Sequence, residues 1–140
     1  MRLKFNILCF LLISQKVLFG GTYHVPSDYS TIQTAINGVI HGDTVIVAPG
    51  VYEETINFNG KAILVASYFV IDSDSSFIYT TIIDAQETGS VVTMKSGETN
   101  SSILLGFTIQ HGNGNYEDPD ENGTYYTHGG GLYIQDSDPS

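Results

Sequence analysis

Residues 42–56 read GDTVIVAPGVYEETI, and this stretch decides the fold. Val45 and Val47 lie on one face of an extended segment, because strand side chains alternate with a period of two. Pro49-Gly50 ends that segment, since proline has no N–H for a sheet and glycine tolerates the turn. Apolar positions resume directly after the corner, at Tyr52, Ile56 and Phe58. The stretch therefore predicts a short strand, a sharp corner and another short strand.

The rest of the sequence repeats this pattern of a short apolar run followed by turn residues. The runs are Val45-Ile46-Val47, Ile63-Leu64-Val65, Ile82-Ile83, Ile103-Leu104-Leu105 and Leu132-Tyr133-Ile134. The first three intervals between them are 18, 19 and 21 residues, and the last is 29. Such a period in β-rich sequence predicts a solenoid of about five stacked rungs. A small antiparallel sandwich is the alternative, although no two-residue Asn-Gly or Asp-Gly hairpin joins paired runs.

Alternation is clearest after residue 102, where every second residue is apolar as far as Ile109. Thr108 and Gln110 fall on the opposite face of that segment. We expect the strands to bury one inward-facing row of side chains, because one face of each strand points to the core. That row contains Val45, Val47, Ile63, Val65, Ile103, Leu105, Phe107, Ile109, Leu132 and Ile134.

Residues 30–37 are predicted to form a short helix, the only one that the sequence indicates after residue 20. Ser30 and Gln33 have the spacing of a capping box, and Asn37-Gly38 is a typical helix end. The apolar side chains between them form a stripe at helical spacing, made of Ile32, Ala35 and Ile36.

Residues 1–20 have the layout of a secretory signal peptide. Met1-Arg2-Leu3-Lys4 is basic, residues 5–13 are almost wholly apolar, and Gly20-Gly21 supplies small residues for cleavage. An uncleaved N-terminal anchor is the alternative, but the apolar run is shorter than a membrane span of about 20 residues. We therefore expect an extracellular or cell-surface protein with one domain at residues 21–140. No membrane insertion is expected after signal removal.

The charge of the mature chain argues against nucleic acid as a partner. Beyond residue 20 only Lys61 and Lys95 are basic, against fifteen acidic residues, which gives a formal charge of −13. Such a surface repels phosphate backbones and anionic lipids. It suits cations and neutral polymers, so a polysaccharide or another cell-surface polymer is the partner class that the composition allows.

Five motifs in this order carry a resemblance to a known family: the helix at 30–37, "GDTVIVAPGVYEETINFNGKAILVAS", "TIIDA", "ILLGFTIQHGNG" and "HGGGLYI". Together they resemble secreted right-handed parallel β-helix proteins of the pectin-lyase-like superfamily. The N-terminal part is similar to the opening of pectin methylesterase-like chains. The resemblance implies an all-β fold, a right-handed parallel β-helix (solenoid) with a short N-terminal capping helix. It indicates activity only weakly, because one fold hosts many functions.

The catalytic residues of the resembled enzymes cannot be completed in this chain. The resemblance implies a basic residue, commonly arginine, for pectate lyases, and a glutamine, two aspartates and an arginine for pectin methylesterases. The chain beyond residue 20 has no arginine. Asp84, Gln110 and His111 each follow a predicted strand, but a lone carboxylate or histidine is more often a turn ligand than a catalyst. We therefore assign no catalytic residue and expect a chain that is not an enzyme by itself.

The loop Asp118-Pro119-Asp120-Glu121-Asn122-Gly123 matches the first half of a calcium loop. It predicts calcium ligands at Asp118, Asp120, Asn122 and the backbone carbonyl of Thr124. The alternative is an ordinary acidic turn, because the twelfth position is Gly129 rather than the glutamate of such loops.

Tyrosines lie on both sides of this acidic loop. Tyr116, Tyr125 and Tyr126 are candidates for carbohydrate binding, because tyrosine rings can stack on sugar rings. The alternative is that these rings pack on the strands.

The sequence thus predicts a secreted or cell-surface β-helix scaffold that contacts carbohydrate or another surface and is not catalytic by itself. The alternative is the N-terminal part of a polysaccharide-processing enzyme of the pectate lyase or pectin methylesterase kind. The strand at 132–134 runs into a short polar tail at 135–140 that is too poor in apolar residues to cover a rung. We therefore expect further rungs beyond residue 140, or end-to-end self-association of the chain as given.

Overall fold

The computed structural model describes residues 20–116 and 127–140. Three short helices lie in these ranges: α1 (Ile32–Gly38), α2 (Phe69–Asp72) and α3 (Ser76–Thr80). The strands are β1 (Thr22–Val25), β2 (Thr44–Val47), β3 (Gly50–Glu53), β4 (Ile56–Asn57), β5 (Leu64–Ser67), β6 (Thr81–Asp84), β7 (Val92–Met94), β8 (Ile103–Leu105), β9 (Thr108–Gln110), β10 (Asn115–Tyr116), β11 (Thr127–His128) and β12 (Leu132–Ile134). None of the described helices is long and apolar enough to cross a bilayer.

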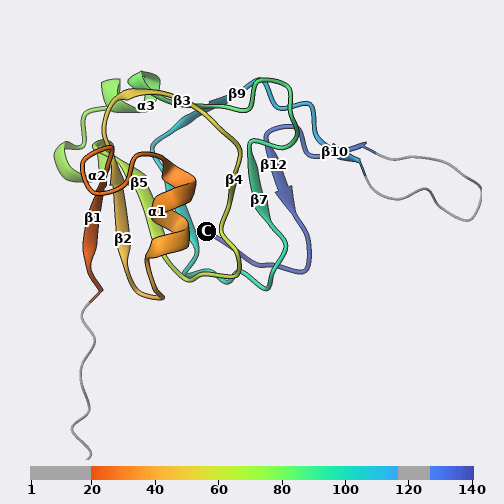
Figure 1. The fold of residues 1–140 in the computed structure, drawn as a ribbon, viewed down its shortest axis with the longest axis horizontal. Coiled ribbons are helices and arrows are strands. Elements are labelled where there is room, and N and C mark those ends of the chain that lie inside the picture. The colour runs from red at the N-terminus through yellow and green to blue at the C-terminus, as the bar shows by residue number, and fades with distance from the viewer. Residues whose placement is uncertain (1–19, 117–126) are drawn as a thin grey trace, which may run out of the picture.

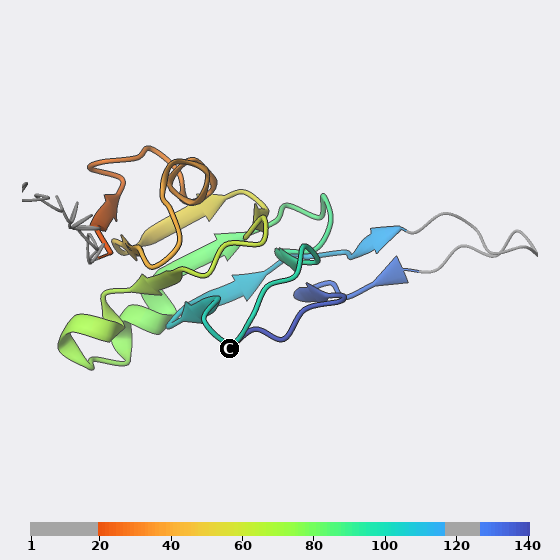
Figure 2. The same cartoon turned by 90° about the horizontal axis from the view of Figure 1, so that it is seen from below.

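The strands form three parallel sheets, which the chain visits in a fixed order. Sheet A has the order β1-β2-β5-β8, sheet B the order β3-β6-β9, and sheet C the order β12-β7-β4. After β1 the chain passes from A to B to C three times, and each pass stacks on the one before (Figures 1 and 2). An antiparallel pair, β10 with β11, leads away from the sheets. This confirms a β-rich chain of parallel strands and contradicts the antiparallel sandwich.

The five apolar runs of the sequence do not correspond to five passes. Three of them form β2, β5 and β8 in sheet A, one lies in β6 of sheet B, and one in β12 of sheet C. The described strands make three passes through the sheets, because two of these passes contain two apolar runs each.

The core lies between the sheets, and part of the row of side chains that was expected to face inward is buried there. Val45, Val47, Ile63 and Val65 are at most 1% exposed, and Phe58 fills the same interior. The expectation for β8 was wrong by one residue: Leu104, the register partner of Val65, packs against the core instead of Ile103 and Leu105. Gly106 explains the shift, because its φ of +83° makes a corner that resets the alternation before Phe107 and Ile109.

Leu132 and Ile134 are the second departure from the expected row. They are in register with Val92 and Met94, which are buried, yet they are 43% and 44% exposed. The reason is their position: β12 is an edge strand of sheet C, so no described strand covers its outer side.

Helix α1 covers the N-terminal end of the stack, as expected, and packs on β1, β2 and β4. Its capping box is formed by Thr31 and Thr34 rather than by Ser30 and Gln33. The following pass secures both ends of the helix. The Glu54 carboxylate accepts hydrogen bonds from the backbone N–H groups of Ile32 and Gln33, and Lys61 Nζ donates to three carbonyls at the C-terminal end.

Helices α2 and α3 correct the expectation that only strands and turns follow α1. They form an excursion between β5 and β6, closed by an edge-to-face contact of Tyr68 and Phe77 with ring centroids 5.7 Å apart. Each has about one turn and neither has a side-chain cap, so the sequence carries no helical periodicity to reveal them.

Candidate functional site

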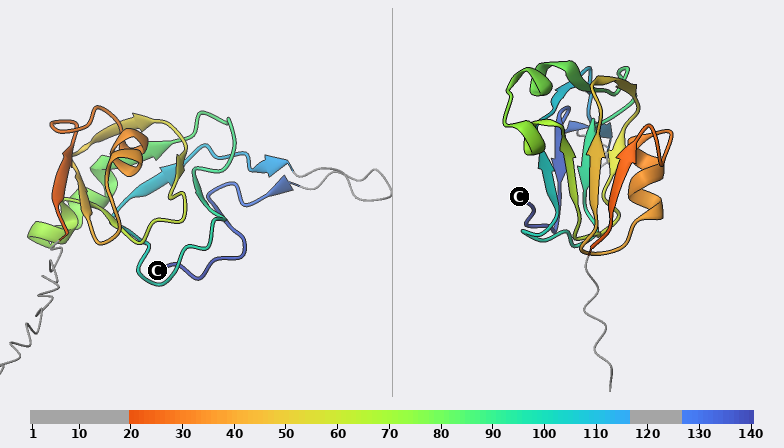
Figure 3. Two further views of the ribbon diagram at one scale, coloured as in Figure 1. Left: turned by 60° about the horizontal axis from the view of Figure 1, so that its bottom comes forward. Right: turned by 90° about the vertical axis from the view of Figure 1, so that its left-hand side faces the viewer.

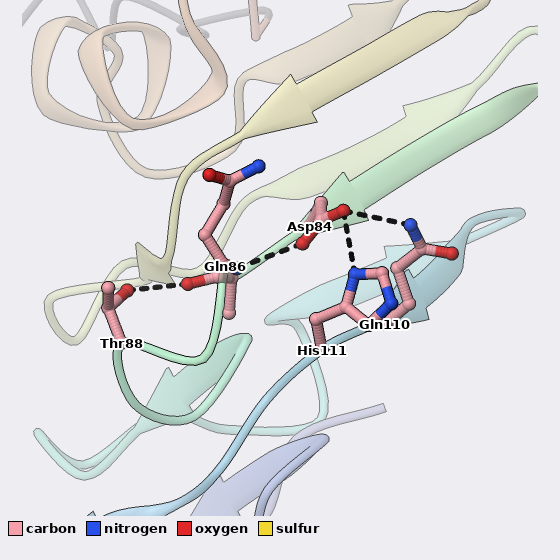
Figure 4. A network of polar contacts seen from close by, with 6 residues as sticks. Asp84, Gln86, Thr88, Gln110 and His111 are labelled. Atoms are coloured by element: carbon pink, nitrogen blue, oxygen red, sulfur yellow. Dashed lines mark hydrogen bonds and ion pairs between the residues drawn. The ribbon is translucent and has the colours of Figure 1, made fainter.

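The candidate site lies where β6 and β9 end, on the outer surface of sheet B. Asp84 is the last residue of β6 and pairs in register with Gln110, the last residue of β9. Their neighbours Ile83 and Ile109 pack in the core, so Asp84 and Gln110 point outward by strand alternation. His111 follows Gln110 directly, and Figure 4 shows the three side chains meeting at Asp84.

Both carboxylate oxygens of Asp84 accept hydrogen bonds. Oδ2 lies 2.8 Å from Nε2 of Gln110 and 2.9 Å from Nδ1 of His111, and Oδ1 lies 2.9 Å from the backbone nitrogen of Gln86. Asp84 is only 6% exposed. Because an ionised carboxylate can only accept, the Nδ1 of His111 carries the hydrogen of this contact.

These contacts set the charge state of Asp84. The side-chain hydrogen bond from Gln110, the backbone N–H of Gln86 and the hydrogen bond from His111 lower the pKa of Asp84 from 3.8 to about 2. The carboxylate is therefore ionised at any physiological pH. It can accept hydrogen bonds and orient the imidazole of His111, but it cannot serve as a proton donor.

A shallow cavity of about 330 Å³ opens beside this cluster and is lined by Asp84, Gln86, Glu87 and His111. The His111 side chain is 59% exposed, whereas Asp84 forms the buried floor. The Nε2 of His111 has no hydrogen-bond partner in the described part of the chain. The cavity thus offers carboxylate, amide and imidazole groups to a ligand from solvent.

Three of the four lining residues adopt a left-handed backbone conformation. The φ angles of Gln86, Glu87 and His111 are +50°, +57° and +52°. A residue other than glycine pays roughly 1–3 kcal/mol for such a conformation, and the surrounding structure must enforce it. Hydrogen bonds between the two loops do so here, because the Glu87 N–H donates to the His111 carbonyl at 2.7 Å and the Ala85 N–H donates to the Gln110 carbonyl at 3.1 Å.

The cavity presents two carboxylates, an amide and an imidazole to a ligand. Carboxylate and imidazole groups can accept hydrogen bonds from a bound ligand, and in other proteins they also act as bases or nucleophiles. Within residues 20–116 and 127–140, no three His, Cys, Asp or Glu side chains stand close enough to hold a metal ion.

The site residues expected from the sequence are not the ones found here. Asp118, Asp120, Asn122, Thr124, Tyr125 and Tyr126 lie outside the described residues. The backbone of Tyr116 lies in β10, and its side chain is likewise not described. The calcium loop and the tyrosine site therefore stay predictions.

In the sequence, Asp84, Gln110 and His111 stand out only as isolated residues that follow strands. They come from successive passes, 26 and 27 residues apart, and parallel stacking places them side by side. The available signal was that Asp84 and Gln110 each end an apolar strand, since equivalent strand ends of a stack lie next to each other.

Compared with known proteins, this chain matches no family model, no curated protein and no solved structure. The resemblance to the pectin-lyase-like superfamily therefore rests on the sequence motifs, and the stacked parallel sheets are compatible with it.

Proposed function

We propose that this chain is a right-handed parallel β-helix that acts as a secreted or cell-surface scaffold and binds carbohydrate in the Asp84 cavity. The repeated passage through sheets A, B and C supports the solenoid fold. The layout of residues 1–20 supports secretion. The scaffold itself is not catalytic; it presents the cavity on a rigid sheet.

The observation that carries the binding proposal is the strained, polar lining of the cavity. Gln86, Glu87 and His111 are held in left-handed backbone conformations around the buried Asp84 carboxylate. Strained residues gather where a binding or catalytic geometry must be fixed. Carboxylate, amide and imidazole groups are also the donors and acceptors that match sugar hydroxyls.

Charge narrows the ligand to a neutral carbohydrate. Asp84 and Glu87 both carry carboxylates at the cavity, and the whole chain has a formal charge of −10. An anionic sugar chain would meet like charges, which are attenuated only over a Debye length of about 8 Å at physiological salt. Uncharged hydroxyls can instead donate to the carboxylate oxygens.

Calorimetric titration with neutral hexasaccharides of glucose, xylose and mannose, and with anionic oligogalacturonate, tests this proposal. We expect at least one neutral chain to bind, and Asp84→Ala to weaken it about tenfold or more, because a charged hydrogen-bond partner is lost. Glu53→Gln is the matched control. Glu53 of β3 is the register partner of Asp84 on the neighbouring strand, but it does not line the cavity. Equal affinity of the two variants would contradict the proposal.

A polysaccharide-processing enzyme is the second candidate, and the Asp84–His111 pair favours it. An ionised carboxylate that orients an exposed imidazole is an arrangement used for general-base catalysis. Polygalacturonate and methyl-esterified pectin, assayed for new reducing ends, released methanol and unsaturated products, test this candidate. Turnover that disappears in His111→Ala would establish the enzyme; no turnover above that variant would exclude it for these substrates.

A further inference from the structure

The first strand of the stack is anchored by the residue that precedes it. β1 is an edge strand of sheet A, and Figure 3 shows it beside α1. Gly21 comes directly before β1. Its N–H donates to Oδ1 of Asp43 at 2.6 Å, and its carbonyl accepts from the N–H of Thr44 at 2.8 Å. Both backbone groups of Gly21 are therefore held by residues at the start of β2.

Asp43 places a carboxylate in a column of inward-facing positions. It is 4% exposed, and the register of sheet A puts Ile63 at its position in the next pass and Ser102 in the pass after that. Both of those residues are at most 1% exposed. The second oxygen of Asp43, Oδ2, accepts from the N–H of Ile40 at 2.8 Å. A carboxylate thus stands where the other passes bury a neutral side chain.

The basic side chains of the stack are engaged elsewhere. Nζ of Lys61 donates to three carbonyls at the end of α1, and the Lys95 ammonium lies over a tyrosine ring. His41 belongs to the same loop as Asp43, but its Nδ1 accepts from the N–H of Ala62 at 3.1 Å, which requires an unprotonated nitrogen. Burying a carboxylate is costly unless a cation pairs with it. The nitrogen of Gly21 is the group placed to become that cation.

Export would turn this nitrogen into an ammonium. Residues 1–20 have the layout of a signal peptide, and the small residues at 20 and 21 suit cleavage between them. We propose that a signal peptidase hydrolyses the Gly20–Gly21 bond and that the new N-terminal ammonium of Gly21 pairs with the buried Asp43 carboxylate. The oxygen of water joins the Gly20 carbonyl carbon to give a carboxylate, and both hydrogens of water go to the Gly21 nitrogen. This inference rests on the secretion in the proposed function and is independent of carbohydrate binding.

The surroundings of Gly21 suit an ammonium. Its nitrogen already lies closer to Oδ1 of Asp43 than the distance of about 2.7–2.9 Å that is typical of charge-assisted contacts. The carbonyl oxygen of Gly42 lies against residue 20, where a side chain would collide with it. It gives a second acceptor beside the new terminus, and an ammonium has three hydrogens to donate.

The ion pair would tie β1 to β2 only in the processed chain. In the uncleaved chain the same nitrogen is a neutral amide, and a neutral hydrogen bond contributes less to stability than one that involves a charged donor. Since Asp43 also holds the N–H of Ile40, the pair would fix the loop between α1 and β2 together with the new terminus.

Mass spectrometry of the chain secreted by a bacterial host tests the cleavage site. We expect an N-terminus at Gly21. A terminus at Gly20, Thr22 or any later residue would overturn this inference but leave secretion standing. A chain that still begins at Met1 would contradict both, and neither result bears on the sugar titrations of the Asp84 cavity.

Stability measurements on two chain starts test the ion pair. One chain begins at Gly21, and the other keeps Gly20 behind one additional alanine, so that only the first has a charged nitrogen at Gly21. We expect Asp43→Asn to raise the equilibrium constant for unfolding about tenfold more in the first chain, because only there does it remove a charged contact. Asp28→Asn is the matched control, since Asp28 accepts from the N–H of His24, and it should act equally in both chains. Equal effects of Asp43→Asn would overturn the ion pair.

Labelling with an amine reagent gives a readout that does not depend on the folding of a variant. Only the free amine reacts, and an ammonium held by a carboxylate releases its proton less readily. In the folded proteins, the amine of the chain that begins at Gly21 should therefore react about tenfold more slowly than the amine of the extended chain. Lys95 is the internal reference in both. Equal labelling rates of the two N-termini would contradict the proposal.

Discussion

Single side chains in this protein connect one pass of the chain to the next, and their charge is set by those connections. Asp84 is held by Gln110 and His111 from the following pass. Glu98 is 2% exposed and accepts hydrogen bonds from the backbone N–H groups of Gly60 and Ser96 and from the hydroxyl of Ser137, so it joins three passes. Buried carboxylates of this kind are stable only while every partner stays in place.

Gln110→Ala should raise the pKa of Asp84 from about 2 toward its usual 3.8, because the strongest of its hydrogen bonds is removed. Carboxyl carbon chemical shifts followed against pH measure this pKa directly. Gln86→Ala is the control, since Gln86 holds Asp84 through its backbone N–H, which alanine retains. A pKa of 3.8 in the parent chain would show that the cluster does not form.

Glu98 gives the protein an acid-sensitive component of stability. Burial alone would raise the pKa of Glu98, but its hydrogen bonds from Ser96, Gly60 and Ser137 lower it below the usual 4.5. A lowered folded-state pKa contributes stability that is full above the unfolded value and lost as pH falls through the folded value. Glu98→Gln should lower unfolding free energy by roughly 1–3 kcal/mol at pH 7. It should also flatten the loss of stability below pH 4.5.

Urea unfolding of both proteins from pH 7 to pH 3 measures this difference. Parallel stability curves for the parent chain and Glu98→Gln would contradict the role assigned to the carboxylate.

At the scale of elements, the helix cap and the strands of the core depend on different sequence features. α1 is seven residues long and is fixed by groups from the next pass, including three carbonyls that receive hydrogen bonds from Lys61. The strands are two to four residues long and derive their stability from stacking on neighbours.

Lys61→Met should destabilise the protein by roughly 1.5–3 kcal/mol, because it removes charged hydrogen bonds to the C-terminal carbonyls of α1 while keeping the apolar stem. Hydrogen exchange should show the loss first in α1 and β1. Lys95→Met is the control, since the Lys95 ammonium lies over the ring of Tyr133, 5.9 Å from its centre, and not at the end of α1. Equal destabilisation by both changes would argue against the cap.

Phe58 and Phe107 both contact the core, but Phe58 is fully buried and Phe107 only partly. Phe58 is 0% exposed, so Phe58→Ala should cost roughly 3–5 kcal/mol. Phe107 is only half-buried beside the Gly106 corner, so the same change there should cost clearly less than the 3–5 kcal/mol of a fully buried phenylalanine. Thermal and urea unfolding of the two variants measure these costs. A larger loss of stability in Phe107→Ala than in Phe58→Ala would contradict the burial described for the two side chains.

Local patterns predicted the strands well and their assembly less well. The alternation around Val45 and Val47 and the Pro49-Gly50 corner correctly indicated β2 and β3, because period two and turn chemistry are local properties. Leu104 was missed because the corner at Gly106 interrupts the alternation.

The Asp84 site could not be predicted from local pattern, because it depends on which residues stack between passes. The excursion that contains α2 and α3 lengthens the pass between β5 and β6, and β6 then pairs with β9 so that Asp84 lies opposite Gln110. Insertions of this kind break a simple period, so the sequence alone does not tell which strand ends coincide.

For the whole molecule, the calcium loop adds a prediction that is independent of the Asp84 cavity. Calcium should bind through Asp118, Asp120, Asn122 and the Thr124 carbonyl, since alternate oxygen ligands suit this cation. Calorimetric titration of calcium into the parent chain and into Asp120→Ala measures it. Unchanged affinity in that variant would remove the hypothesis, whereas Glu98→Gln, far from the motif in sequence, serves as the control.

Carbohydrate binding in the Asp84 cavity is the central proposal for this protein. Amide chemical-shift mapping during titration with the neutral hexasaccharide that binds best measures this directly, because every backbone amide reports its own environment. The predicted result is a set of saturable shifts confined to residues 84–88 and 110–112, absent in Asp84→Ala. Shifts centred on Tyr116, Tyr125 and Tyr126 instead, or none at all with any neutral sugar, would contradict the account.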